Sequence, residues 1–163
     1  MDLGTILKVA HAVLGVWIIA GLVGRWVTLG QAARSSDIVA VHTLLRLSDR
    51  FEWIVVRMPP FVLLIGVATA IVQGRPFLGP LQGAGVDWLL VSIVIYLSII
   101  PVIPLVFLPR GRVFAAALAE ATDAGVVTPA LTAAFRDPVV FAAHVYELAV
   151  IVGVFVLMIT KPF

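Results

Sequence analysis

The sequence predicts an all-α polytopic membrane protein: four transmembrane helices in an antiparallel bundle, forming a single domain over residues 1–163. Three observations predict this fold class. Of the 163 residues, 62% are hydrophobic and 12% are charged, whereas soluble domains are about 45–50% apolar and about 25% charged. The mean hydropathy is +1.15. Four apolar segments also reach the roughly 20 residues that a membrane-spanning helix needs; they cover about residues 5–28, 54–73, 88–108 and 138–160.

The connection between the first and second spans is polar. Asp37 is a candidate N-cap there, and the apolar residues that follow recur at helical spacing, opposite Arg46 and Arg50. This pattern predicts an interfacial helix that leads into the second span. Pro59 and Pro60 should kink or restart that span, because proline lacks a backbone N–H and clashes with the preceding turn.

The third span contains no charged residue, and Asp87 is its expected N-cap. Pro101 and Pro104 lie inside it. Each proline leaves a carbonyl one turn back without its usual donor. In lipid such a carbonyl needs another donor or a wet cavity, so we expect a distortion here that neighbouring helices absorb.

The third connection is alanine-rich and too polar to cross a membrane. It predicts a surface helix that ends at Gly125, and then a short helix capped by Thr128 with Pro129 in its first position. Asp137 and Pro138 repeat this cap-and-proline pattern, so the fourth span should begin there.

Basic residues are distributed unequally between the two sides of the predicted bundle. One side holds only Lys8, Arg75 and Lys161. The positive-inside rule therefore predicts that both termini and the 74–87 loop lie outside the cytoplasm. Because the basic residues flank apolar segments, they do not suggest a nucleic-acid partner. The other side holds Arg25, Arg34, Arg46, Arg50, Arg57, Arg110, Arg112 and Arg136.

Several ionisable residues fall inside the predicted spans. His144 and Glu147 are three positions apart, on one helical face. Such groups are costly in lipid and mark either a function or a specific interhelical contact. A rise of about 1.5 Å per residue places His11 in the outer half of the membrane. The same estimate gathers Arg25, Glu52, Arg57, His144 and Glu147 toward the cytoplasmic leaflet.

Three interpretations of these residues are open. In a non-catalytic structural or accessory subunit, Glu147 would neutralise Arg25 while His144 donates a hydrogen bond. In a haem-binding or redox-accessory protein, His11 or His144 would ligate the iron of haem b, and Arg25 and Arg57 would pair with the propionates. In a small proton- or ion-coupled transporter, Glu147 and His144 would form a relay.

Some chemistry is excluded. His11 and His144 are expected about 18 Å apart along the membrane normal, so they cannot be the two axial ligands of one haem. One His–Glu pair is too few ligands for a closed metal site. The sequence has no cysteine and no nucleophile elbow, phosphate loop or zinc-protease motif. No catalytic residue is therefore predicted.

Two stretches resemble a family of predicted four-helix bacterial integral membrane proteins without an assigned function: LKVAHAVLG near the N-terminus, and LRLSDRFEWIVVRMPPFVLLIGVATAI. More distantly, the chain is similar to copper-resistance-D-like domains and membrane protoporphyrinogen oxidases, which also place a histidine early in their first helix. His11 corresponds to that histidine, which is associated with haem in the oxidase-like branch. With three methionines, the chain lacks the methionine- and histidine-rich tracts expected for copper handling.

Together, these observations predict a bundle in the lipid bilayer of the bacterial cytoplasmic membrane. We expect it to associate with itself or with a larger membrane complex.

Overall fold

The computed structural model describes residues 1–162, and every regular element in this range is helical. The all-α prediction is therefore confirmed. In chain order the elements are α1 (Leu3–Ala32), α2 (Ile38–Val72), the short 3₁₀ helix η1 (Gly79–Gln82), α3 (Trp88–Leu97), the π-helix η2 (Ile103–Phe107), α4 (Leu108–Ala124), α5 (Pro129–Phe135) and α6 (Pro138–Thr160).

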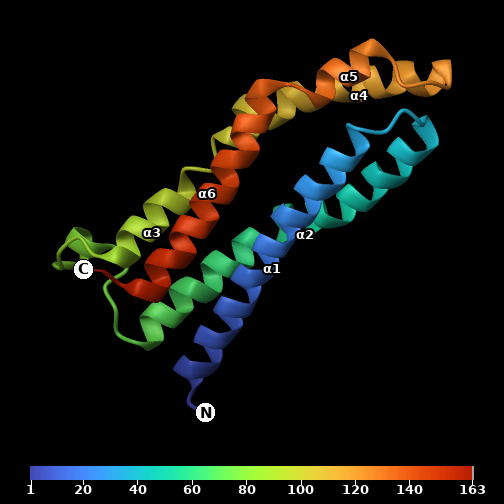
Figure 1. Ribbon diagram of the computed structural model, residues 1–163. Helices are drawn as coiled ribbons and strands as arrows, with labels where there is room; N and C mark the ends of the chain where they lie inside the picture. Colours follow the sequence, from blue (N-terminus) through green and yellow to red (C-terminus); the bar gives the residue numbers. More distant parts are fainter. Residues whose placement is uncertain (163) are drawn as a thin grey trace.

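Helices α1 and α2 lie side by side along most of their length and form the α1–α2 hairpin (Figure 1). Glycines on α1 make this close approach possible. A Cβ atom at Gly24 would lie 2.5 Å from the ring of Phe51, and one at Gly21 would lie 3.2 Å from the Ile54 side chain. The contact between the two helices therefore depends on small residues at these positions.

The predicted interfacial helix and the second span are one continuous helix, α2, which has 35 residues and passes through Pro59 and Pro60 without a break. The expected restart at the prolines is wrong. Val55, before the prolines, and Val62, after them, both pack into the same core as α1 residues Ile18 and Leu22. This packing on both sides holds the helix together where local propensity alone would interrupt it.

The third predicted span is not one helix, because α3 ends at Leu97 and a π-helix begins only at Ile103. The prolines explain the break. Pro101 cannot donate to the Leu97 carbonyl, which instead accepts from the N–H of Ile100 at 3.1 Å. Pro104 likewise cannot donate to the Ile100 carbonyl, which accepts from the N–H of Ile103 at 3.3 Å. Each freed carbonyl thus takes a donor one residue earlier, and the turn tightens.

Of the four predicted spans, three coincide with long apolar helices. Helices α1, α2 and α6 lie in segments long and apolar enough to cross a membrane. Helix α3 is apolar but has 10 residues, fewer than the roughly 17 that a spanning helix needs. It lies beside α6 (Figure 1).

The predicted boundaries in the third connection are confirmed. Helix α4 ends at Gly125, whose φ of +68° is the left-handed conformation that glycine adopts at least cost. Thr128 caps α5 by accepting from the N–H of Leu131 at 3.2 Å, with Pro129 as the first residue. Asp137 caps α6.

The interior has two apolar clusters. The first joins Ile18 and Leu22 of α1 to α2. The second joins Val41, near the start of α2, to Ala121 of α4 and Leu131 of α5. The predicted surface helices therefore pack on one another at the end of the molecule far from both termini (Figure 1). We refer to this as the α4–α5 end, and to the opposite end as the terminal end.

The close approach of α1 and α2 gives a test of the fold. Gly24→Ala should lower the free energy of unfolding by about 1–3 kcal/mol, because its Cβ would displace the Phe51 ring. Gly30→Ala on the same helix is the control. Nothing lies within 4 Å of a Cβ there, so this change should be neutral or stabilising by up to about 1 kcal/mol. Unfolding followed by circular dichroism in detergent measures both, and equal effects would contradict the packing described.

Candidate functional site

A cluster of four polar residues links three helices in the interior. Arg25 of α1 is at its centre and is 5% exposed. Its Nη1 donates to Oε2 of Glu52 on α2 at 2.6 Å, and its Nη2 donates to Oε2 of Glu147 on α6. With His144, these residues form what we call the Arg25 cluster. It joins the α1–α2 hairpin to α6.

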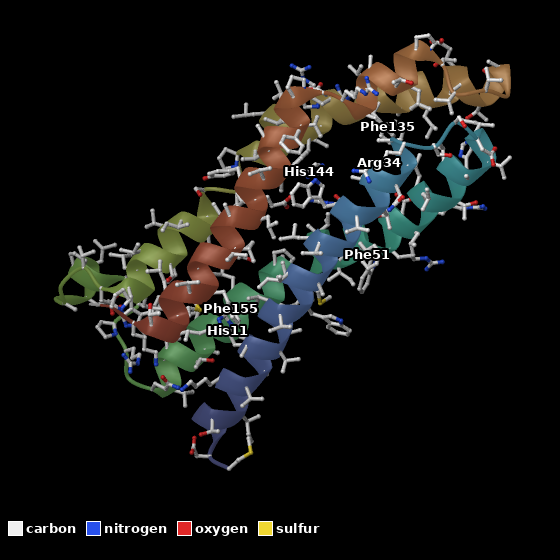
Figure 2. All side chains as sticks on the ribbon, in the orientation of Figure 1. His11, Arg34, Phe51, Phe135, His144 and Phe155 are labelled. Atoms are coloured by element: carbon white, nitrogen blue, oxygen red, sulfur yellow. The ribbon has the colours of Figure 1, made fainter. Side chains whose placement is uncertain are left out.

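His144 completes the cluster as an acceptor. Figure 2 shows it projecting from α6 toward α1, where its Nδ1 lies 3.0 Å from Nη2 of Arg25 and 3.7 Å from Oε2 of Glu147. A guanidinium group only donates, so Nδ1 accepts and a neutral ring carries its proton on Nε2. The ring of Phe107, from the π-helix, packs on His144 with ring centroids 5.0 Å apart. The sequence had indicated that His144 donates within this contact; the geometry toward Arg25 has it accepting.

The Arg25 cluster has no buried polar atom without a hydrogen-bond partner. No buried side-chain nitrogen or oxygen within residues 1–162 lacks a hydrogen-bond partner. The Arg25–Glu147 pair is buried, with side chains 7% and 9% exposed, whereas the Glu52 side chain is 46% exposed. One arginine thus faces two carboxylates, and only Glu52 has its charge partly solvated. This arrangement suits a contact that fixes helix positions.

Arg57, the other arginine singled out by the sequence, lies elsewhere. It is exposed on α2 and has no ion pair with any of residues 1–162. Across the same residues, no group of three or more His, Cys, Asp and Glu side chains could hold a metal ion. Of the residues that the sequence gathers at one level, the structure brings four together and leaves Arg57 apart: the four are Arg25, Glu52, His144 and Glu147. His11 is separate from them, as expected.

His11 lies in the half of the molecule nearer the termini. Its Nδ1 is 3.0 Å from the carbonyl oxygen of Val62 on α2, so Nδ1 carries the proton and donates. Its Nε2 is therefore the unprotonated nitrogen, and it lies 3.4 Å from Sδ of Met158 on α6. Gly66 makes room for the ring, because a Cβ there would lie 2.7 Å from Cε1 of His11. A Cβ at Gly15, one turn along α1, would meet nothing within 4 Å.

A cavity of about 480 Å³ lies beside His11, between the α1–α2 hairpin and helices α3 and α6. Figure 2 shows His11 and Phe155, two of its lining residues, at this level of the molecule. Tyr96 of α3 also lines it and donates its hydroxyl to the Pro59 carbonyl at 2.8 Å. Most of the wall is apolar. The lining includes His11, Gly15, Ile18, Val62, Gly66, Trp88, Ile93, Tyr96, Ile151, Phe155 and Met158.

Three basic residues line the same cavity, and with Trp88 they form what we call the basic mouth. They are Lys8 of α1, Arg75 after α2 and Lys161 at the end of α6. The Cζ of Arg75 lies 5.7 Å from the Trp88 ring centroid, and the Nζ of Lys161 lies 5.5 Å from it. None of the three forms an ion pair within the described chain.

The sequence did not indicate the cavity or its mouth. Lys8, Arg75 and Lys161 were identified as the basic residues of one side, which suggests a common level but not a common site. Met158 lies 147 positions from His11, and no local pattern connects two residues so far apart.

The fold and these two sites define an all-helical integral membrane protein with a buried ion cluster at one level and an apolar cavity at another. The chain belongs to the family described as predicted integral membrane protein (DUF2269), whose model matches residues 5–162. The resemblance to a family of predicted integral membrane proteins is thus confirmed. No curated protein and no solved structure matches the chain, so the more distant likeness to copper-resistance-D-like domains and protoporphyrinogen oxidases stays a prediction.

Two isosteric substitutions separate the buried ion pair from the exposed one. Glu147→Gln should lower the free energy of unfolding by about 2–4 kcal/mol, because Arg25 loses its buried counter-charge and keeps only Glu52. Glu52→Gln should cost about 0–1 kcal/mol, because that carboxylate is half exposed. Chemical unfolding in mixed micelles measures both. A larger loss for Glu52→Gln would show that Glu147 is not the principal partner of Arg25.

Proposed function

We propose that this protein is a haem-binding or redox-accessory membrane protein that holds haem b in the cavity through His11. The single observation that carries the proposal is the state of the His11 ring. Its Nδ1–H is held by the Val62 carbonyl, which leaves the lone pair of Nε2 at the cavity wall. Metal-ligating histidines almost always donate their second ring N–H in this way, because it fixes both tautomer and orientation.

The cavity residues fit such a group. Ligand pockets have volumes of about 300–1,000 Å³ and mostly apolar walls, and this cavity has about 480 Å³. Sδ of Met158 lies 3.4 Å from Nε2, which leaves no room for an iron between them, so Met158 would pack beside the group that His11 holds. Lys8, Arg75 and Lys161 would pair with the propionates. When bound there, haem would supply one-electron redox chemistry, while the surrounding apolar side chains exclude water from it.

His11 and His144 are the two histidines that the sequence predicts as candidate haem ligands. Of these, His144 is the weaker candidate. Its Nδ1 already accepts from Arg25, and its ring packs against Phe107. Arg25 is occupied by Glu52 and Glu147, so it is not available for a propionate. The proposal therefore keeps His11 from the predicted ligand set and moves the charge partners from Arg25 and Arg57 to the basic mouth.

The placement in the membrane is also part of the proposal. We take α3 and η2 together as a fourth crossing, tightened at its prolines, which makes the molecule an antiparallel four-helix bundle. The distribution of basic residues puts the α4–α5 end in the cytoplasm and both termini outside a bacterial cytoplasmic membrane. The cavity would then open toward the outer leaflet. Association with a second copy or with a larger membrane complex stays a prediction.

A second candidate function is a non-catalytic structural or accessory subunit. The Arg25 cluster favours it, because it leaves no buried side-chain nitrogen or oxygen without a partner and it joins three helices. In that case the cavity would hold no cofactor. A relay through Glu147 and His144 has no comparable observation in its favour.

A visible absorption spectrum distinguishes the first two candidates. Protein expressed with adequate haem and purified in detergent should show a Soret band. His11→Ala should remove it, and Met158→Leu should shift or weaken it. His144→Ala is the matched control, since it removes a histidine outside the cavity, and it should leave the band unchanged. A wild-type protein without a Soret band would exclude the haem proposal and favour the structural subunit.

A further inference from the structure

We propose that the basic mouth binds the phosphate group of an anionic phospholipid whose acyl chain enters the cavity. This site does not depend on haem. It does share the cavity with the proposed cofactor, so lipid and cofactor should exclude each other.

Three cations converge on the mouth from distant parts of the chain. Lys8 is in the second turn of α1, Arg75 is in the loop after α2, and Lys161 is the C-cap residue of α6. No carboxylate among residues 1–162 forms an ion pair with any of them. Like charges repel when they are brought to one edge of a low-dielectric cavity, and an anion at the mouth would compensate this repulsion.

The local geometry maintains this convergence. Lys161 has a φ of +44°, which non-glycine residues rarely adopt, and its backbone N–H donates to the Leu157 carbonyl at 2.9 Å. In this conformation its ammonium lies 5.5 Å from the Trp88 ring centroid, and Arg75 lies 5.7 Å from the same ring. One indole therefore contacts two of the three cations.

Trp88 also indicates the depth of the mouth. Tryptophan is enriched at the boundary between hydrocarbon and headgroups, where its ring contacts apolar chains and its N–H reaches polar groups. Here it is the first residue of the apolar helix α3. The cations around it are then at the level of lipid phosphates, which arginine binds in a bidentate manner and lysine as a point charge.

The distribution of polarity through the cavity favours a lipid over a small anion. Below the mouth the wall is mostly apolar, with Ile93, Ile151 and Phe155 among its residues, which suits an acyl chain. Asp87 directly precedes Trp88 of the mouth in the sequence. Its carboxylate caps α3 by accepting from the N–H groups of Leu89 and Leu90. Within residues 1–162 the mouth therefore offers no free carboxylate for a choline or ethanolamine cation, and an anionic headgroup is the better match.

Lipid retention tests the proposal directly. The wild-type protein, exchanged into detergent with equal amounts of phosphatidylglycerol and phosphatidylcholine of identical acyl chains, would be analysed by native mass spectrometry. We expect at least tenfold preferential retention of phosphatidylglycerol, and its loss in a Lys8→Glu/Arg75→Glu/Lys161→Glu variant. Excess glycerol phosphate should not displace the lipid, because it lacks the acyl chain.

The matched control carries the same change of charge at the α4–α5 end. Arg34, Arg46 and Arg50 are exposed there, and Arg34→Glu/Arg46→Glu/Arg50→Glu should retain phosphatidylglycerol as the wild type does. A milder variant, Lys8→Gln/Arg75→Gln/Lys161→Gln, serves if the charge reversal impairs folding. Equal retention of the two lipids by the wild type, or equal loss in mouth and control variants, would overturn the lipid site. Displacement by glycerol phosphate would reduce it to a simple anion site.

A titration with haem separates this inference from the proposed function. Added phosphatidylglycerol should weaken haem binding to the wild type, whereas the same amount of phosphatidylcholine should leave it unchanged. If no Soret band forms while phosphatidylglycerol is retained selectively, the cofactor proposal fails and the lipid site stands. If the band forms but the two lipids are retained equally, the lipid site fails alone.

Discussion

The buried pair of Arg25 and Glu147 is the interaction on which the relative position of the helices depends. An arginine that is 5% exposed can be tolerated in an apolar interior only if its charge is compensated and its donors are used. Glu52, on the partner helix of the α1–α2 hairpin, meets part of that need. The remainder is met by Glu147 and His144 from α6. A displacement of α6 would leave these groups unpaired, so the cluster determines how α6 docks against α1 and α2.

The two ends of the molecule differ in how completely they are packed. At the α4–α5 end, Val41, Ala121 and Leu131 are wholly buried in one apolar cluster. At the terminal end, the space between the α1–α2 hairpin and helices α3 and α6 is a cavity of about 480 Å³. Along the α1–α2 hairpin, the Arg25 cluster lies between this packed end and His11, whose unprotonated Nε2 is at the cavity wall. Fixing the helices at one level allows a gap to persist between them at another.

The sequence predicted what is local and missed what depends on contacts between distant residues. The caps at Asp37, Thr128 and Asp137 follow from one side chain and the backbone of the next turn, and they are all present. The continuity of α2 through Pro59 could not be inferred, because it depends on packing against α1. Among the candidate site residues, the depth in the membrane estimated from the helical rise predicted that Arg25 and Glu147 lie at the same level, and the two residues do pair. Depth alone could not show that His11 meets Val62 and Met158, since it does not determine which helix faces which.

The unbroken length of α2 has a mechanical consequence. At about 1.5 Å per residue, its 35 residues extend for about 52 Å, whereas the hydrocarbon layer of a bilayer is about 30 Å thick. The helix is therefore longer than the hydrocarbon layer, and its first turns pack against α4 and α5. If α2 tilts about its middle, the displacement of its first turns increases with their distance from that point. For a helix that crosses a membrane, the thickness of the bilayer would in this way affect the position of the surface that α4 and α5 form.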